Sequence, residues 1–447
     1  MGLFDKLRGD DKPRVAFFGI DGVPYSFLED HFDEFEHLAA LAEEGSSGAI
    51  DSIVPPESSA CWPSLTTGVN PGKTGVYGFQ DREVGSYDTY VPMGRDVQAT
   101  RIWDRVHDAG RDATVMNVPV TFPPQRNVQR MVSGFLSPSI DKAAYPDELR
   151  DYLQSIDYKL DANPKLGHDE DKSEFIEDAH KTLDARYEAF KHYLQQDDWD
   201  LFFGVFMTTD RVNHFLFKHY EEDMEYKDEF VEFYRKVDRY LGEIRQNLPD
   251  DVTMMVASDH GFTTLDYEVH FNQWLADEGW LSFEDDDHED LGDISEDAEA
   301  YSLIPGRFYI NLEGREPRGS VPESEYEAKR DQLKEALENL KGPNGRKVCD
   351  RVVEKEEAFH GDHEDIAPDL VAIPNHGFDL KAGFKGHDDV FGQGPRNGMH
   401  SFDNASLFVD DPDATIRDVD LYDIAPTILD LMEMEYDAGE FDGKSLV

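Results

Sequence analysis

The stretch RVAFFGIDG at residues 14–22 decides the fold class, because a near-continuous apolar run ends there in Asp-Gly. Such a run suits a strand that is covered on both faces, as in a parallel sheet. The Asp-Gly pair predicts that the strand ends in a turn. Further strands are predicted from similar apolar runs at residues 113–118, 201–207, 252–258, 369–374 and 405–409.

Longer amphipathic patterns alternate with these runs. They predict helices at residues 26–44, 172–195, 222–247, 323–341 and 420–433. This alternation is typical of an α/β fold, with a mostly parallel central sheet that helices cover on both faces.

One part of the chain interrupts the alternation. An acidic run at residues 284–300 falls within it, and the interruption extends to about residue 385. We expect an inserted cap region at about residues 275–385, within one domain that spans residues 13–447. Residues 1–12 are expected to form a flexible N-terminal segment.

The charge balance is extreme, with 96 acidic against 43 basic residues and a formal net charge of −53 at pH 7. High net charge can indicate disorder, but here the acidic residues are interspersed with regular apolar segments. We therefore expect a folded, halophilic protein whose acidic surface suits a salt-rich cytoplasm. Because no basic stripe could meet phosphates, a nucleic-acid polymer is not an expected partner.

The sequence also bears on localisation. No stretch approaches the roughly 20 consecutive apolar residues of a membrane span, and the start MGLFDKLRG lacks a signal-peptide core. The two cysteines, Cys61 and Cys349, imply no disulfide framework. A cytoplasmic protein without integral membrane association is expected, and no feature indicates its oligomeric state.

Polar residues follow or flank several predicted strands. In open α/β sheets, ligands bind beyond the carboxyl ends of the strands. A single aspartate there is more often a turn former, and a single histidine is usually structural. The coincidence of several at one edge favours a site, and its candidates are Asp21, Asp210, His214, Asp259, His260 and His400.

The spacing of these residues suits metal ions. Asp210 and His214 lie four apart, so on a helix they share one face. Asp259 and His260 are adjacent and converge only if the strand breaks, for which Gly261 is the expected cause. Carboxylates and imidazoles without thiolates favour Zn²⁺ or Mn²⁺. Two such ions, about 3.5–4 Å apart, would clamp the attacking and leaving oxygens of a phosphoryl transfer.

These motifs occur in a familiar order. GIDG, PPESS followed by WPSLTTGVNPGKTGVYGF, TDRVNH, SDHGF and a late MH together resemble the alkaline phosphatase superfamily. The chain is most similar to the type I phosphodiesterase/nucleotide pyrophosphatase branch, especially its uncharacterised phosphohydrolase or phosphomutase members. The resemblance covers roughly residues 14–447.

The resemblance implies roles for individual residues. It implies one ion held by Asp210, His214 and His400. It implies a second held by Asp21, Asp259 and His260, with the nucleophile bridging toward it. The resulting metal ligands would be Asp21, Ser58, Asp210, His214, Asp259, His260 and His400, around two divalent ions, Zn²⁺ or Mn²⁺.

The nucleophile must be chosen within residues 55–75, which offer Ser58, Ser59, Cys61, Ser64, Thr66 and Thr67. In the resembled families it precedes the Thr-Gly pair of the following helix by nine residues, which selects Ser58. Cys61 begins a sulfatase-like CWPS, but Leu65 stands where that signature needs Arg. The alternative role for Ser58 is that of a helix N-cap.

The predicted function is that of a metal-dependent phosphoesterase, which hydrolyses a phosphodiester or pyrophosphate bond of a small phosphate ester through a phospho-serine intermediate. A phosphomonoesterase or phosphomutase with the same nucleophile is the alternative. A non-catalytic relative that binds phosphorylated sugars or lipids would be expected to lack a ligand, and none of the seven is missing.

The charge predicts that folding depends on salt. Because screening at molar KCl shortens the Debye length to about 3 Å, repulsion among the surface acids should largely disappear there. We expect the thermal midpoint, followed by circular dichroism, to rise steeply between low and molar KCl. A midpoint that is indifferent to KCl would show that the acidic surface is no adaptation to salt.

Overall fold

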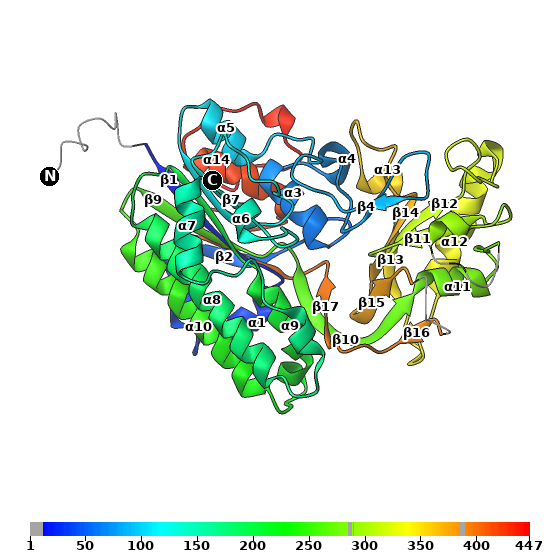
Figure 1. Ribbon diagram of the computed structural model, residues 1–447, viewed down its shortest axis with the longest axis horizontal. Coiled ribbons are helices and arrows are strands. Elements are labelled where there is room, and N and C mark those ends of the chain that lie inside the picture. The colour runs from blue at the N-terminus through cyan, green and yellow to red at the C-terminus, as the bar shows by residue number, and fades with distance from the viewer. Residues whose placement is uncertain (1–11, 285–287, 289, 384–388) are drawn as a thin grey trace.

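The computed structural model describes residues 12–284, 288, 290–383 and 389–447. The segment expected to be flexible, residues 1–12, lies outside the described residues except for Lys12. The chain forms a larger lobe around the central sheet and a smaller lobe at one end of it (Figure 1). Among the described helices, none is both long and apolar enough to cross a membrane.

The larger lobe contains an eight-stranded sheet in the order β2-β18-β9-β1-β8-β5-β6-β7. Its strands are β1 (Arg14–Ile20), β2 (Ser46–Ile50), β5 (Ala113–Val118), β6 (Arg130–Ser133), β7 (Ala144–Tyr145), β8 (Leu201–Phe206), β9 (Val252–Ala257) and β18 (Ala405–Val409). The five strands from β9 to β6 are parallel, and β18 adds to β9 antiparallel. The predicted α/β fold with a mostly parallel sheet is confirmed.

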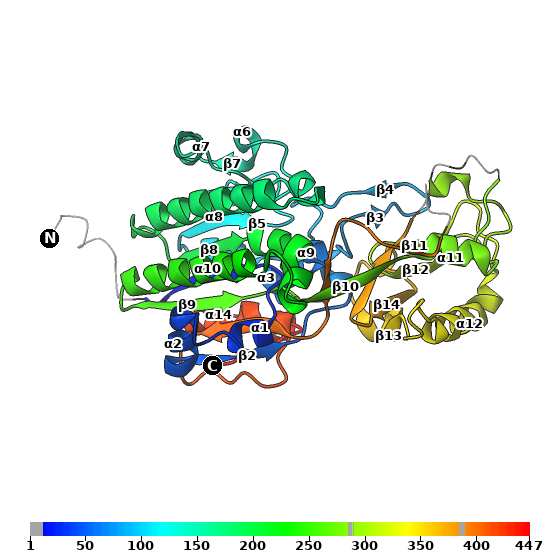
Figure 2. The ribbon, with the colours of Figure 1, turned by 90° about the horizontal axis from the view of Figure 1, so that it is seen from below.

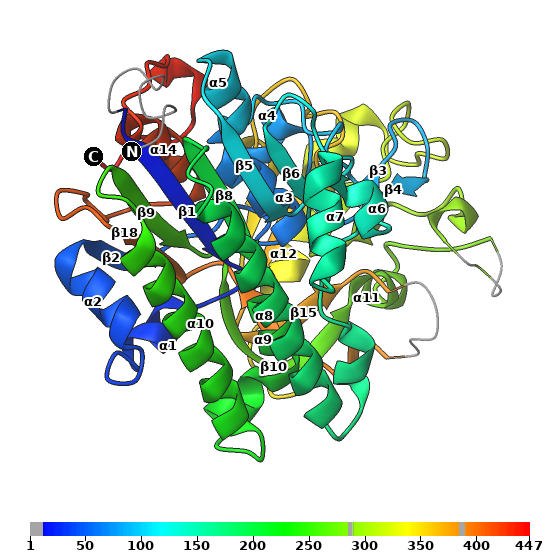
Figure 3. The same cartoon turned by 60° about the vertical axis from the view of Figure 1, so that its left-hand side comes forward.

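Helices cover both faces of this sheet, as Figures 2 and 3 show. One face is covered by α1 (Tyr25–Glu29), α2 (Glu36–Glu44), α7 (Asp147–Ser155), α8 (Ser173–Leu194), α9 (Thr208–Glu221) and α10 (Lys227–Asn247). The other carries α3 (Ser58–Thr67), α5 (Ile102–Asp108) and α14 (Ile424–Leu431). Short helices α4 (Pro71–Thr74) and α6 (Ile140–Ala143) lie in the connections.

Strand β1 shows why the sheet is buried on both sides. Successive side chains of a strand point to opposite faces. Phe18 accordingly packs near Phe190 of α8, with ring centroids 6.0 Å apart, while Phe17 stacks on Phe203 at 4.2 Å beneath the other helix layer. Every residue of β1 is buried, which accounts for its continuous apolar sequence.

The smaller lobe has its own sheet and its own hydrophobic core. Its antiparallel sheet has the order β11-β12-β14-β13, from β11 (Ala300–Leu303), β12 (Arg307–Ile310), β13 (Cys349–Glu354) and β14 (Leu370–Pro374). Its helices are α11 (Phe271–Asp277), α12 (Tyr326–Asn339) and α13 (Lys355–Ala358). These elements fall within or close to the residues expected to form an inserted cap.

Long strand pairs connect the two lobes. Strand β10 (Gly261–His270) starts in the larger lobe, pairs there with β17 (Gly398–Ser401), and then pairs with β15 (Gly377–Lys381) and β16 (Phe391–Gly392) of the smaller lobe. The hairpin of β3 (Asp81–Arg82) and β4 (Thr89–Tyr90) also extends toward the smaller lobe (Figure 2). Arg307 of β12 is fully buried and forms an ion pair with Asp81, which fixes the smaller lobe to this hairpin.

Two predicted elements differ from the structure. The run at residues 369–374 is not a central strand, because β14 lies in the sheet of the smaller lobe. A buried antiparallel strand is apolar for the same reason as a parallel one, so its sequence does not reveal its sheet. The helix predicted at residues 26–44 is broken into α1 and α2 by turns at residues 30–34.

Gly19 in β1 leaves space for the ring of Trp62. A Cβ at position 19 would lie 2.3 Å from Cη2 of that ring, so we expect Gly19→Ala to lower the free energy of unfolding by about 1–3 kcal/mol. Urea denaturation in molar KCl measures this loss. In a Trp62→Phe background the loss should shrink, and an equal loss in both backgrounds would contradict the clash.

Candidate active site

Three carboxylates lie at the carboxyl ends of three adjacent parallel strands. Asp21 follows β1, Asp259 follows β9, and Asp210 lies in the first turn of α9, directly after β8. Strand β1 is hydrogen-bonded to both β8 and β9, so the three ends meet at one point. All three side chains are buried, which concentrates negative charge in a region of low polarity.

The first turns of α9 supply two of the predicted residues. Residues four apart on a helix share a face, and His214 Nε2 lies 3.4 Å from Asp210 Oδ1. The second carboxylate oxygen of Asp210 accepts from Arg211 Nη1 at 3.2 Å. Arg211 also donates to Asp161 at 2.8 Å, so Arg211 holds the Asp210 side chain in one orientation.

The chain leaves β9 after Ala257, and this break lets Asp259 and His260 both reach the site. The expectation that Gly261 supplies the break is wrong, since β10 begins at Gly261 itself. The glycine is required for a different reason. A Cβ there would lie 2.1 Å from the carbonyl oxygen of Asp403, so only glycine permits this close approach.

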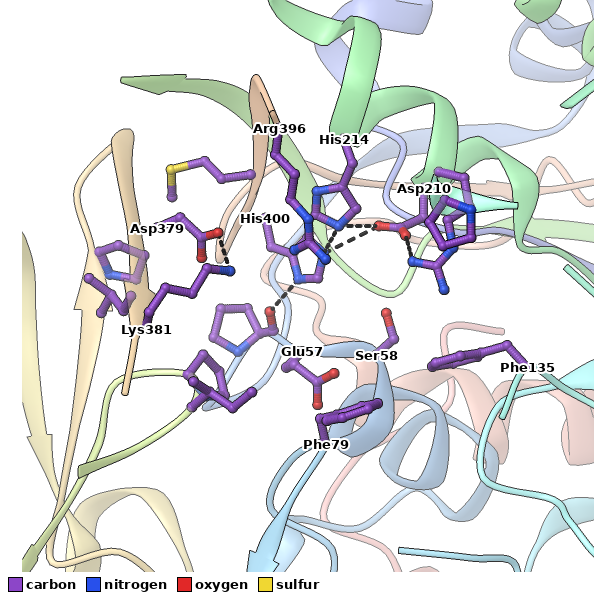
Figure 4. A pocket seen from close by; sticks show the side chains of 18 of the residues that line it. Glu57, Ser58, Phe79, Phe135, Asp210, His214, Asp379, Lys381, Arg396 and His400 are labelled. Carbon is purple, nitrogen blue, oxygen red and sulfur yellow. Dashed lines mark hydrogen bonds and ion pairs between the residues drawn. The ribbon is translucent and has the colours of Figure 1, made fainter. Parts of the chain in front are cut away.

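His400 reaches the site from β17, where it lies opposite Phe262 of β10. Its Nε2 lies 3.2 Å from Asp210 Oδ1 and 3.2 Å from His214 Nε2 (Figure 4). His260 lies beside the other two carboxylates, because its Nε2 lies 3.5 Å from Asp259 Oδ2 and 3.7 Å from Asp21 Oδ1. The structure therefore brings all six predicted carboxylate and imidazole residues together.

The three imidazoles present the same nitrogen to the site. The Nδ1 atoms of His214, His260 and His400 lie 3.1, 3.0 and 3.3 Å from the carbonyl oxygens of Gly398, Gly261 and Pro56. A carbonyl oxygen only accepts, so each Nδ1 carries the proton in these hydrogen bonds. When the imidazole is neutral, each Nε2 is left as a lone-pair donor, which is how histidines that ligate metals are held.

The carboxylates give a second reason to expect cations. Asp210 Oδ1 and Asp259 Oδ2 are buried and have no hydrogen-bond partner among the described residues. Burial and the neighbouring charges of Asp259 and Asp210 raise the pKa of Asp21 well above its usual value. Burial chiefly raises the pKa of Asp259 to about 7. Buried carboxylates that repel one another fit a site for divalent cations, and these oxygen and nitrogen donors suit Zn²⁺ or Mn²⁺.

Ser58 lies in the first turn of α3 and faces this cluster. Its Oγ lies 3.4 Å from Asp21 Oδ1, to which it can donate, and 3.2 Å from His260 Nε2. The alternative of an N-cap serine is wrong, because the cap is Glu57, whose side chain accepts from the backbone N–H of Ser59. The hydroxyl of Ser58 is therefore not used to cap the N-terminus of α3.

Cys61 lies one turn further along α3, where its thiol contacts Ser52. Its Sγ lies 3.3 Å from Ser52 Oγ and the side chain is fully buried. Burial raises the pKa of the Cys61 thiol well above its ordinary value, which opposes formation of a thiolate nucleophile. The neighbouring Trp62 is buried too, and its indole N–H donates to Asp21 Oδ2 at 2.7 Å.

A cavity of about 390 Å³ opens over Ser58 between the two lobes. Both lobes contribute apolar side chains to its wall, namely Phe79, Phe135, Leu136, Pro164 and Met207 from the larger lobe and Ile304, Pro305, Ala372, Pro374 and Leu380 from the smaller lobe. On the smaller lobe and the strands that lead to it, the wall includes Asp379, Lys381 and Arg396 (Figure 4). None of these three residues, nor Arg211, is predicted as a site residue from the sequence. Only Arg211 could have been identified from the sequence, because it is adjacent to the candidate ligand Asp210.

The fold is that of the alkaline phosphatase superfamily. More closely, the sequence profile described as "Type I phosphodiesterase / nucleotide pyrophosphatase" matches residues 15–403. The chain therefore belongs to this family of metal-dependent enzymes. Among curated proteins, no sequence matches the chain.

Solved structures agree with this assignment at the level of the fold. Phosphonoacetate hydrolase from Sinorhizobium meliloti 1021, in complex with phosphonoacetate, superimposes with a TM-score of 0.64 at 17% identity, over 94% of this chain and 96% of that chain. Murine ectonucleotide pyrophosphatase/phosphodiesterase 5 gives a TM-score of 0.53 at 14% identity, over 94% of this chain and 95% of that chain.

The cluster predicts that the protein binds divalent cations in two places. After chelation and reloading with Zn²⁺ or Mn²⁺, elemental analysis should find about two ions per chain, and reloading should raise the thermal midpoint. His400→Ala removes a donor of one group only, so it should lower the count to about one. His107→Ala, at an exposed histidine of α5, is the control and should keep both ions.

Proposed function

We propose that the protein is a phosphoesterase that cleaves a phosphodiester or pyrophosphate bond through a phospho-serine intermediate at Ser58. The observation that carries this proposal is the position of the Ser58 hydroxyl. It lies at the start of α3, within 3.4 Å of Asp21 and His260, and it lines the cavity between the lobes. Family membership and the shared fold support the same class of reaction.

The proposed metal ligands form two groups. Asp210, His214 and His400 would hold one ion, and Asp21, Asp259 and His260, with Ser58, would hold the other. When bound, two such ions stabilise negative charge on the attacking and leaving oxygens of a phosphoryl transfer. The remaining contributions come from the protein itself.

Ser58 is oriented by its neighbours. Its hydroxyl donates toward Asp21 Oδ1, so the oxygen lone pairs are directed away from that carboxylate. Asp21 is itself fixed by the indole N–H of Trp62. Burial lowers the pKa of His260 to about 3, so its imidazole is neutral at physiological pH and offers Nε2 as a lone pair beside the serine.

The start of α3 also favours a phosphate. The N-terminus of a helix carries partial positive charge and free backbone N–H groups, which attract anions. Because Ser58 is the first residue of α3, a phosphorus atom within reach of its Oγ lies close to this positive end. Attack forms the bond from Ser58 Oγ to phosphorus, breaks the bond from phosphorus to the leaving oxygen, and transfers the hydroxyl proton to Asp21 Oδ1, its hydrogen-bond acceptor.

The cavity has room for a substrate with two substituents on phosphorus. Its volume of about 390 Å³ is lined by apolar side chains of both lobes and by a charged wall of Asp379, Lys381 and Arg396. The apolar wall beside Ser58, with Phe79 and Phe135, suits an uncharged group of the ester. This favours a diester or pyrophosphate over a simple monoester, although both share the same nucleophile.

The test compares two model substrates in molar KCl with Zn²⁺ or Mn²⁺. We expect bis-p-nitrophenyl phosphate to be turned over with a higher kcat/KM than p-nitrophenyl phosphate. The reverse preference would identify a phosphomonoesterase. Transfer of the phosphoryl group to an added alcohol or sugar phosphate would identify a mutase.

Ser58→Ala tests the nucleophile separately. We expect this variant to lose turnover by about 10⁴-fold or more, as removal of a catalytic nucleophile does in other hydrolases, while it still binds metal ions. Acid quenching of the wild-type enzyme during turnover should trap a phosphoryl group on the peptide with Ser58, by mass spectrometry. Ser59→Ala is the matched control and should remain active, because Ser59 is buried and does not line the cavity. An active Ser58→Ala would overturn the mechanism.

A further inference from the structure

The charged wall of the cavity carries two cations that the proposed chemistry does not use. Lys381 ends β15, and Arg396 lies between β16 and β17, four residues before His400. Both line the cavity, together with Asp379. They approach it from the side of the smaller lobe and of the strands that lead to it, whereas Phe79 and Phe135 line it from the larger lobe (Figure 4).

Arg396 has no ion-pair partner among the residues that the structure describes. It is partly buried, and its charge acts on His214 and on Asp379, so it lies between the metal cluster and the smaller lobe. A guanidinium that lines a cavity without a carboxylate partner offers planar, paired donors to an anionic ligand.

Lys381 is held in place by Asp379. The Nζ–Oδ2 distance is 2.5 Å, and Asp379 is the more buried partner. Burial opposes ionisation of this carboxyl, but the charge and hydrogen bond of Lys381 lower the pKa of Asp379 below its usual value. One carboxylate therefore faces two cations on this wall, which leaves an excess of positive charge.

The position of Ser58 defines what these cations would meet. In an in-line displacement the leaving group departs on the side of phosphorus opposite the nucleophile. In Figure 4, Ser58 lies below the group of Asp210, His214 and His400, Arg396 comes down from above beside His400, and Lys381 lies to the left of His400. A leaving group that departs from phosphorus away from Ser58 therefore moves toward the side from which Arg396 enters, and Lys381 lies beside that path.

We propose that Arg396 and Lys381 form a subsite for an anionic group on the leaving group, so that the enzyme prefers esters whose leaving group carries a carboxylate or a second phosphate. Asp379 is a positioning residue that orients Lys381. This inference rests on the proposed attack by Ser58 for its direction, but the subsite itself can be tested without turnover.

The kinetic test uses methyl aryl phosphate diesters that differ only in the para substituent of the leaving phenol. The 4-carboxy and 4-phosphono compounds carry an anion and separate the two sources of charge, whereas the 4-carbamoyl compound is neutral. The readout is the ratio of kcat/KM for each anionic substrate to kcat/KM for the neutral one. The wild-type ratio should exceed one. Arg396→Gln should lower it about 10–100-fold, in line with the loss of a charged hydrogen bond.

Matched variants separate charge from folding. Arg396→Lys should recover part of the ratio, and Lys381→Gln should lower it less than Arg396→Gln does, because Asp379 partly neutralises Lys381. Lys341→Gln, at an exposed lysine of the smaller lobe outside the cavity, should keep the wild-type ratio. Circular dichroism in molar KCl verifies that each variant is folded.

An equilibrium measurement needs no catalysis. Titration calorimetry should show that Ser58→Ala binds 4-hydroxybenzoate at least tenfold more tightly than 4-hydroxybenzamide, and that adding Arg396→Gln removes this difference. The Ser58→Ala variant could bind 4-hydroxybenzoate more tightly than 4-hydroxybenzamide and yet turn over substrate at the wild-type rate. In that case the proposed function fails and the subsite stands. If neither the kinetic ratio nor the binding difference depends on Arg396 or Lys381, the subsite is overturned.

Discussion

The structure depends on one electrostatic constraint, the burial of three aspartates at the ends of three neighbouring strands. Asp21, Asp210 and Asp259 lose most of their hydration, and their charges repel one another at short range. Such a cluster is tolerated only where positive charge and hydrogen-bond donors compensate it. Trp62 and Arg211 supply part of this compensation from the protein, and we propose that cations held by the carboxylates and imidazoles supply the rest.

The cluster around the three aspartates also links the two lobes structurally. His400 belongs to β17, which pairs with β10, the strand that continues from the larger lobe into the smaller one. The cluster therefore includes a side chain whose position depends on how β10 and β17 are paired. Lys381 and Arg396 precede His400 in the chain and lie on the same side of the cavity. One segment thus contributes both to the cluster and to the wall that faces the leaving group.

Much of this arrangement could be predicted from the sequence, because its physical causes are local. β1, β5 and β18 occupy the residues predicted for them, since a strand buried on both faces must be continuously apolar. Strand-end polar residues and motif order led to the seven candidate site residues. The sheet to which β14 belongs could not be predicted, nor could the cations of the cavity wall. Both depend on how segments distant in sequence meet, and a lone Arg396 in a loop resembles any solvated arginine.

The net charge of −53 raises the question of how such a protein attracts an anionic ester. At molar salt the Debye length is about 3 Å, so the many surface carboxylates barely act on a substrate at a distance. Steering by the overall field is then weak, and only groups in direct contact decide affinity. Under that condition an acidic surface and an anion-binding cavity are compatible. Selectivity then depends on the few positive groups of the cavity, namely the start of α3, the proposed cations, Arg211, and Arg396 with Lys381.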